Sequence, residues 1–185
     1  MKTCGLYFGS FNPFHIGHLA IVNYLVSYTN LDTVRVVLSP LNPLKKGKVP
    51  ADDHPAGRLQ HIRSVLEAKK FQVQVSDIEF SLPQPHYTIN TLHHFCKNEP
   101  HTQFVLVVGA DQLRDIEQWH EWKNLLKEFP FYVYPRHGVD SKALQVRYAP
   151  LAREIVLLQA PLVTVSSTFI REGLAAGKNM NGFIV

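Results

Sequence analysis

A glycine-containing loop near the N-terminus carries two histidines three residues apart. Gly9 opens the loop, and His15 and His18 stand where a segment of helical periodicity begins. Residues i and i+3 share a helix face, so we expect both imidazoles to face one ligand. Free N–H groups at a helix start bind anions, and glycine lets the backbone approach them closely. The loop therefore predicts a phosphate site, with two structural histidines as the alternative; a zinc site lacks a third ligand.

A second anion-binding pattern lies near the other end of the chain. Ser166, Ser167 and Thr168 precede Arg171, and Gly177 follows. Serine and threonine cap helix N-termini and glycine ends helices, so the pattern predicts a helix between them. Arginine offers forked donors that suit phosphate. Taken alone, the same residues also describe an ordinary capped helix.

Short apolar runs alternate with segments of helical period along the chain. Six strands are expected, at Cys4–Phe8, Val34–Leu38, Val73–Phe80, Phe104–Val108, Phe131–Tyr134 and Ile155–Leu158. Most are apolar at nearly every position, which is typical of strands covered on both faces of a parallel sheet. The alternation predicts an α/β fold, a doubly wound, Rossmann-like parallel sheet with helices on both faces.

Apolar residues at helical spacing predict three further helices. Their buried faces are expected at Ile16, Leu19, Val22 and Val26, at Leu59, Ile62 and Leu66 after Pro55, and at Ile89, Leu92 and Phe95. Ligands of such sheets bind beyond the carboxyl ends of the strands, where the strand order reverses. We therefore expect the site in the loops after Phe8, Leu38 and Val108 and after the stretch 162–165. The long stretch Ser39–Asp53 is predicted to be a substrate loop.

The composition excludes several other classes of protein. With 185 residues, 45% of them hydrophobic, the chain fits one folded domain over residues 1–185. Cys4 and Cys96 form no CxxC pair, which argues against a disulfide scaffold and fits a reducing cytosol. No apolar run approaches the ~20 residues of a membrane helix, and no signal peptide is recognisable, so a cytoplasmic protein without a membrane partner is expected. The net charge of +4 favours a small anionic substrate, and the dispersed Lys and Arg argue against nucleic acid.

Four motifs, in order along the chain, resemble one family. The segment Gly9–His18 resembles the GxFxPxHxGH signature of the nucleotidyltransferase superfamily, and Ser166–Arg171 resembles its SSTxIR signature. Between them, Tyr87–Leu92 resembles a YTxxTL segment, and Gly109–Trp119 a GADxxxxxxxW segment. Together they resemble the bacterial nicotinate mononucleotide adenylyltransferases over nearly the whole chain.

The resemblance implies adenylyl transfer from ATP to nicotinate mononucleotide, with release of pyrophosphate, as a step of NAD biosynthesis. The attacking phosphate is already an anion near neutral pH, because its second pKa is ~6. Catalysis then consists of in-line positioning and neutralisation of charge in the transition state. His15, His18 and Arg171 are the implied catalytic residues, with His18 nearest the transferred phosphorus.

Further site residues follow from the same resemblance. It implies ATP contacts at Gly9, Ser10, Phe11, His15, His18, Gly109, Asp111, Ser167 and Arg171. It implies contacts with the mononucleotide at Asn12, Lys45, Thr88, Trp119 and Arg136. Trp119 would lie by the nicotinate ring, with a core tryptophan as the alternative, and Mg²⁺ would arrive with the ATP phosphates.

The chain departs from the family pattern in two places. The loop Ser39–Lys46 only partly matches the usual PPH(K/R), which leaves open whether Lys45 or Lys46 contacts phosphate. Family members usually continue with a short last helix after the segment corresponding to 181–185, so the resemblance raises the expectation that this helix is missing.

Three alternatives remain at this stage. Phosphopantetheine adenylyltransferases share the fold and the chemistry but usually carry Thr in place of His15. Residues 15–18 spell the HIGH signature of class I aminoacyl-tRNA synthetases, although no KMSKS-like lysine loop appears. A non-catalytic nucleotide- or RNA-binding module would instead show a basic and aromatic stripe.

The segment Tyr87–Asn90 also predicts which pyridine is accepted. It is expected to open a helix with Thr88 as the cap, so free backbone amides there would favour the nicotinate carboxylate over a neutral amide. Together with the cost of unpaired donors, this predicts at least about a tenfold preference in kcat/KM for the acid.

Overall fold

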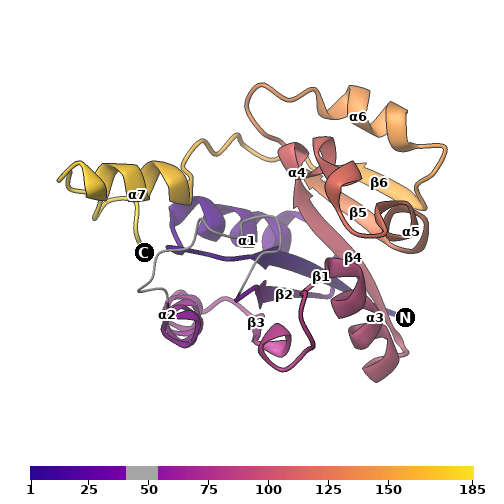
Figure 1. Ribbon diagram of the computed structural model, residues 1–185, viewed down its shortest axis with the longest axis horizontal. Helices are drawn as coiled ribbons and strands as arrows, with labels where there is room; N and C mark the ends of the chain where they lie inside the picture. Colours follow the sequence, from indigo (N-terminus) through magenta and orange to yellow (C-terminus); the bar gives the residue numbers. More distant parts are fainter. Residues whose placement is uncertain (41–53) are drawn as a thin grey trace.

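Residues 1–40 and 54–185 are described in the structure, a computed structural model. Six strands form a parallel sheet in the order β3-β2-β1-β4-β5-β6 (Figure 1). Their bounds are β1 Lys2–Gly9, β2 Thr33–Leu38, β3 Val73–Ser76, β4 Thr102–Gly109, β5 Pro130–Tyr134 and β6 Glu154–Leu157. The chain builds outward from β1 in both directions, so the strand order reverses between β1 and β4. The predicted doubly wound α/β fold is confirmed.

Helices cover both faces of this sheet. Their bounds are α1 Ile16–Tyr28, α2 Pro55–Ala68, α3 Thr88–Asn98, α4 Ala110–Arg114, α5 Trp122–Glu128, α6 Ser141–Tyr148 and α7 Ser167–Ala175, with the short 3₁₀ helices η2 Ile78–Phe80 and η3 Ile116–Gln118. Apolar residues of α1 and α2 join one core, and those of α3 to α6 join the other. Helix α7 extends beyond α1 at one end of the molecule (Figure 1).

The inner segments of β1 and β4 are apolar because each of their faces meets a core. On β1, Leu6 packs into the core under α3 to α6, and Tyr7 packs into the core under α1 and α2. On β4, Leu106 packs into the core under α3 to α6, and Val107 packs into the core under α1 and α2. This confirms the interpretation of the apolar runs as doubly covered strands.

The third strand is shorter than the sequence predicts. It was expected to run over Val73–Phe80, but β3 ends at Ser76 and residues Ile78–Phe80 form η2. The Ser76 hydroxyl accepts a hydrogen bond from the Ile78 N–H at 3.3 Å, which turns the chain out of the strand. The apolar residues of η2 imitate a strand pattern, so the boundary could not be found from periodicity.

The buried face of α1 also differs from the prediction. Ile16 and Val26 are more than one-third exposed, whereas Ile21 and Leu25 are buried beside the predicted Val22. Helix α1 carries apolar residues around much of its circumference, so several faces satisfy the helical spacing. Packing on the sheet selects one of them.

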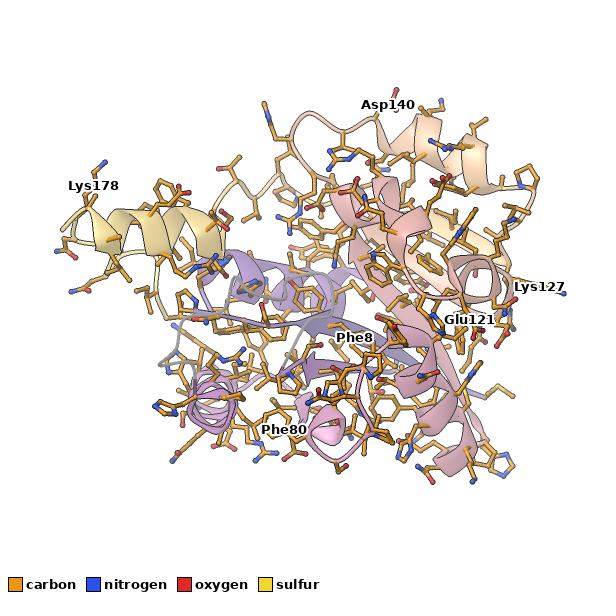
Figure 2. The ribbon with its side chains drawn as sticks, in the orientation of Figure 1. Phe8, Phe80, Glu121, Lys127, Asp140 and Lys178 are labelled. Carbon is orange, nitrogen blue, oxygen red and sulfur yellow. The ribbon has the colours of Figure 1, made fainter. Side chains whose placement is uncertain are left out.

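The last helix begins and ends as its sequence predicts. Ser166 caps α7, because its Oγ accepts from the Phe169 N–H at 3.1 Å, and Gly177 follows the helix with a φ of +68°. Lys178, just beyond, marks the outer end of the molecule, whereas Phe8 lies near its centre (Figure 2). Within the described ranges, no helix is long and apolar enough to cross a membrane.

Candidate active site

A pocket of about 500 Å³ opens at the carboxyl ends of the strands. One part of its wall comes from the loop after β1, from α1 and from the start of α7, including Ser10, His18 and Ser167. Another part comes from the start of α3 and from the segment between α4 and α5, including Thr88 and Trp119. This is where doubly wound sheets bind ligands, and the volume suits a nucleotide.

The loop between β1 and α1 folds around a cluster of aromatic rings. Phe11 has a φ of +45° and is buried, with its ring centroid 5.5 Å from Tyr7 and 5.6 Å from Phe14. A Cβ at position 9 would lie 2.7 Å from the Phe11 ring, so only glycine fits there. Arg58 of α2 also donates to the Ser10 carbonyl. The aromatic cluster and the hydrogen bond from Arg58 thus both fix the conformation of this loop.

His18 is oriented by its neighbours and lines the pocket. Its ring stacks on His15 at 3.7 Å and lies edge-on to Phe11 at 4.9 Å. His18 Nδ1 accepts a hydrogen bond from the His15 backbone N–H at 3.3 Å. A neutral imidazole that accepts at Nδ1 carries its proton on Nε2, so His18 presents a donor at the N-terminus of α1.

His15 has a different environment, although it is only three residues away. It is 3% exposed, it is the N-cap of α1, and its Nδ1 accepts from the Gly17 N–H at 3.1 Å. Burial lowers the pKa of His15 to about 4, and the positive charge of Arg136 adds to the shift. The ring is therefore neutral near pH 7 and lies behind His18 rather than in the pocket wall, contrary to the expectation that both rings face the ligand.

The start of α7 is fastened to the loop after β1. The Ser167 hydroxyl donates to the Pro13 carbonyl at 3.1 Å. Arg171 Nη1 donates to the Asn12 carbonyl at 2.6 Å, and its Nη2 donates to Thr168 Oγ1 at 3.2 Å. The bonds to Pro13 and Asn12 join segments more than 150 residues apart and bring the two predicted anion sites together.

Asp111 and Arg136 form an ion pair at the end of β4. Asp111 Oδ1 and Arg136 Nε lie 3.4 Å apart, and neither atom has a hydrogen bond of good geometry among the described residues. A Cβ at Gly109 would overlap the Asp111 carboxylate and come within 2.9 Å of Arg136 Nε. Glycine at this position thus leaves room for the pair.

Aromatic rings line the part of the pocket next to α3. The Tyr87 ring stacks on His120 at 4.0 Å, and Trp119 also lines the pocket. Thr88 lines the pocket as the first residue of α3, but it is not the cap. The N-cap is Tyr87, whose side chain makes no capping bond, so the prediction of Thr88 as a helix cap is wrong.

A buried carboxyl group lies behind this wall. Glu79 is 1% exposed, and its Oε1 accepts from Thr91 Oγ1 at 2.8 Å. Burial raises the pKa of Glu79, and hydrogen bonds from the side chains of Ser39 and Thr91 oppose this shift. Ser39 lines the pocket after β2 and its N–H donates to the Gly9 carbonyl at 2.9 Å. Glu79 therefore connects α3 with the β1 side of the site.

Comparison with known proteins decides the family. The chain matches the cytidylyltransferase-like family over residues 6–173. The probable nicotinate-nucleotide adenylyltransferase of Flavobacterium psychrophilum is 42% identical over 176 residues, which cover 95% of this chain and 88% of the relative. That of Flavobacterium johnsoniae is 39% identical with the same coverage. This chain belongs to the nicotinate-nucleotide adenylyltransferase family.

Solved structures share the fold of this adenylyltransferase. A Plasmodium falciparum nicotinic acid mononucleotide adenylyltransferase complexed with NaAD superposes with a TM-score of 0.79 at 16% identity, covering all of this chain and 91% of that one. The same protein complexed with APC gives 0.78 at 18% identity, with 100% and 90% coverage.

The fold of this adenylyltransferase brings most of the predicted site residues together. Those lining the pocket are Gly9, Ser10, Phe11, His18, Asp111, Thr88, Trp119, Arg136 and Ser167. Those that do not line it are His15, Asn12, Gly109 and Arg171. His15 stacks on His18, Asn12 follows Phe11 and the Gly109 N–H bonds Gln112, so these three adjoin pocket residues, whereas Arg171 reaches only Asn12 and Thr168 among the described residues. Lys45 lies outside the described residues.

Other pocket residues were not predicted individually as site residues, although Ser39 and Tyr87 lie in segments that the sequence analysis assigned to substrate binding. They are Tyr7, Phe8, Ser39, His86, Tyr87, Gln112, Asp115, Gln118, His120 and Leu125. A signal existed for Asp115, which stands four residues after Asp111 and so shares its side of the helix. No signal marked His86 or Tyr7, because their exposure to the pocket depends on neighbouring strands and helices.

Within residues 1–40 and 54–185 of the adenylyltransferase, no three His, Cys, Asp or Glu side chains are grouped so as to hold a metal ion. The pocket does contain the carboxylates of Asp111 and Asp115. Such carboxylates can accept hydrogen bonds from the waters of a hydrated Mg²⁺ ion. The residues present thus fit an ion that enters with a phosphate ligand.

Proposed function

We propose that this chain transfers the adenylyl group of ATP to nicotinate mononucleotide. A phosphate oxygen of the mononucleotide forms a bond to the α-phosphorus of ATP. The bond from that phosphorus to the bridging oxygen breaks, and pyrophosphate leaves with the electron pair. The products are nicotinic acid adenine dinucleotide and pyrophosphate.

The observation that carries the proposal is the joining of two helix N-termini at one end of the pocket. The Ser167–Pro13 and Arg171–Asn12 hydrogen bonds hold the start of α7 against the loop that leads to α1. Both helices direct the positive end of their dipole at this part of the pocket, although the first N–H groups of α1 bond within the protein, that of Ile16 to the Phe183 carbonyl and that of Gly17 to His15 Nδ1. Two such ends suit the triphosphate of ATP.

Individual residues take roles that follow from their positions. His18 donates from Nε2 to the α-phosphate as charge develops on it, and His15 holds the His18 ring from behind. Arg171 exchanges its bond to the Asn12 carbonyl for the departing pyrophosphate, with Ser167 beside it. Arg136 receives the mononucleotide phosphate, and Trp119 lies against the pyridine ring.

Mg²⁺ is proposed to enter on the ATP phosphates, where it supplies neutralisation of negative charge. Asp111 and Asp115 would bind waters of that ion from the pocket wall. The protein groups then orient the two anions in line and exclude water, which is most of what this reaction requires.

The proposal is tested by pyrophosphate release from purified protein with ATP, Mg²⁺ and one acceptor at a time. Nicotinate mononucleotide is expected to support release, and phosphopantetheine is expected not to. Release with phosphopantetheine alone would assign the related adenylyltransferase instead. A folded protein that releases none with nicotinate mononucleotide would refute the proposal.

A further inference from the structure

The imidazole of His86 is a buried polar group to which the described part of the chain provides no hydrogen-bond partner. Its side chain is 9% exposed, and it forms part of the pocket wall. No hydrogen bond joins it to any residue that the structure describes, and its Nδ1 is buried. Buried polar side chains are nearly always hydrogen-bonded, so an unpaired one at a pocket wall calls for an external partner.

The surroundings of His86 indicate what shape of ligand lies next to it. The next residue is Tyr87, whose ring stacks on His120 at 4.0 Å, and Trp119 is the neighbour of His120. This part of the wall therefore offers flat aromatic surfaces with one unpaired polar ring among them. A planar ring that carries a polar substituent matches both features.

His86 can pair with an acid or an amide, but not equally well. Burial lowers the pKa of His86, so the free ring is neutral and carries one N–H donor and one acceptor. A carboxylate accepts the N–H in a charge-assisted bond, which is about twice as strong as a neutral one. An amide forms only the neutral bond, whichever tautomer the ring adopts.

We propose that His86 determines the choice of pyridine by donating its ring N–H to the carboxylate of the acceptor's nicotinate ring. This inference rests on the proposed function, because it assumes that the acceptor is a pyridine mononucleotide. It assigns the discrimination between acid and amide to a side chain, in addition to the backbone N–H groups at the start of α3. His86 acts on binding of the ring and leaves the ATP contacts untouched.

The test uses three variants of the full chain with matched shapes. His86→Phe keeps a ring but removes both nitrogens, His86→Asn keeps a polar group near Nδ1, and His86→Gln keeps one near Nε2. We measure kcat/KM for nicotinate and nicotinamide mononucleotides, KM for ATP and the melting temperature. For His86→Phe we expect about a 10- to 100-fold loss with the acid and about a 2- to 10-fold loss with the amide.

The ratio of kcat/KM for the acid to kcat/KM for the amide distinguishes recognition of the carboxylate by His86 from a purely structural role. We expect the acid preference to fall in His86→Phe with an unchanged KM for ATP, and one of His86→Asn and His86→Gln to restore it. An unchanged acid preference in His86→Phe would overturn the proposal. Restoration by neither polar variant, or a rise in KM for ATP that matches the rise for the acid, would also overturn it.

Calorimetric measurement of mononucleotide binding separates the test of His86 from the test of the proposed function. Wild-type protein that binds the acid mononucleotide but releases no pyrophosphate refutes the proposed function, while the binding constants of His86→Phe still test His86. Wild-type protein that releases pyrophosphate, with a His86→Phe variant that retains full acid preference, refutes only the role of His86.

Discussion

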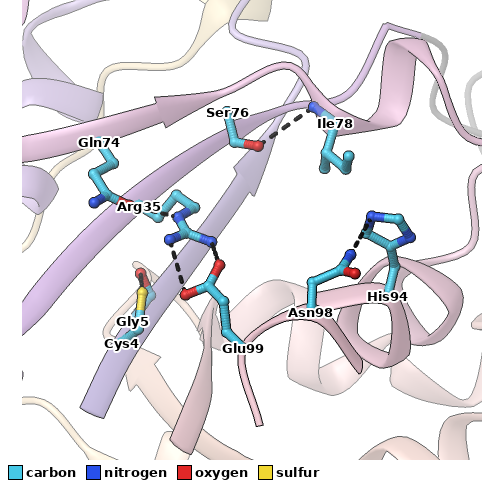
Figure 3. Close-up of polar contacts among 9 residues, drawn as sticks. All are labelled: Cys4, Gly5, Arg35, Gln74, Ser76, Ile78, His94, Asn98 and Glu99. Atoms are coloured by element: carbon cyan, nitrogen blue, oxygen red, sulfur yellow. Dashed lines mark hydrogen bonds and ion pairs between the residues drawn. The ribbon is translucent and has the colours of Figure 1, made fainter. Parts of the chain in front are cut away.

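At the amino ends of the strands, Arg35 of β2 is held by several partners. It donates to Gln74 Oε1 at 2.8 Å and to both carboxylate oxygens of Glu99 at 2.8 and 3.3 Å (Figure 3). Its guanidinium also lies 4.8 Å from the centroid of the Phe95 ring. These contacts join β2, β3 and the end of α3, so they stabilise the sheet.

At the carboxyl ends, polar side chains are left incompletely paired. Four buried atoms have no hydrogen bond to the described residues, namely His86 Nδ1, Glu79 Oε2, Asp111 Oδ1 and Arg136 Nε. Unpaired buried polar atoms cost stability, and folded proteins retain them where a ligand completes the bonding. Side chains at the amino ends of the strands therefore stabilise the sheet, whereas those at the carboxyl ends keep polar atoms unpaired for a ligand.

Among substitutions that test this difference between the two ends of the strands, we expect the largest effect on activity at His18. His18→Ala removes a donor aimed at developing charge, so kcat should fall ~10²–10³-fold with little change in ATP binding. Steady-state kinetics with pyrophosphate detection measures this. The matched control is His93→Ala, since His93 bonds Glu128 at 2.7 Å on the outer surface. A His18→Ala variant that retains most of the wild-type kcat would remove His18 from the mechanism.

His15 lies at the carboxyl ends of the strands but, unlike that of His86, its Nδ1 is hydrogen-bonded, so we expect it to contribute to stability. Its pKa is about 4 in the folded protein, against about 6.5 unfolded, so between these values the unfolded chain binds more protons. The free energy of unfolding should therefore fall as pH drops below 6.5, by roughly 2–3 kcal/mol at pH 4.5.

Urea unfolding at pH 7.5 and 4.5 measures this loss. The control is His15→Asn, because asparagine caps helices well but does not titrate. The variant should lose less stability than wild type between the two pH values. Equal losses would show that His15 is not the group that titrates.

A substitution at Arg35 tests whether the amino ends of the strands contribute to stability and not to activity. Arg35→Met removes the bonds to Glu99 and Gln74 and should lower the free energy of unfolding by about 1.5–3 kcal/mol, with kcat/KM unchanged. Arg63→Met is the control, because the Arg63–Asp77 pair is about half exposed and should contribute less than about 1 kcal/mol. If the Arg35→Met variant is fully folded but loses much of its activity, the amino ends of the strands also contribute to the site and the proposed difference between the two ends is wrong.

The smallest effect is expected at Thr91. Thr91→Val removes the hydroxyl that bonds Glu79 and loosens the start of α3, which should raise KM for the mononucleotide about two- to fivefold. Thr91→Ser keeps the hydroxyl and should retain the wild-type value. Equal KM values in Thr91→Val and Thr91→Ser would show that the Glu79 bond does not position the pocket wall.

Local sequence patterns were sufficient for much of the fold. The apolar runs located all six strands, and Pro55 and Ser166 marked the starts of α2 and α7, because these signals act within a few residues. The patterns failed at Ile78–Phe80 and on the faces of α1, where apolar residues satisfied more than one spacing. There, the choice depended on what packed against the segment.

The four motifs, by themselves, indicated the family and fewer than half of the residues that line the pocket. The tertiary structure decided which of two histidines three residues apart is buried and neutral and which lines the pocket. It also decided that Arg171 bonds the carbonyl of Asn12, 159 residues away in the chain, and that His86 Nδ1 has no hydrogen-bond partner among residues 1–40 and 54–185. Burial and hydrogen bonding depend on atoms that distant segments bring together, and no local pattern records those atoms.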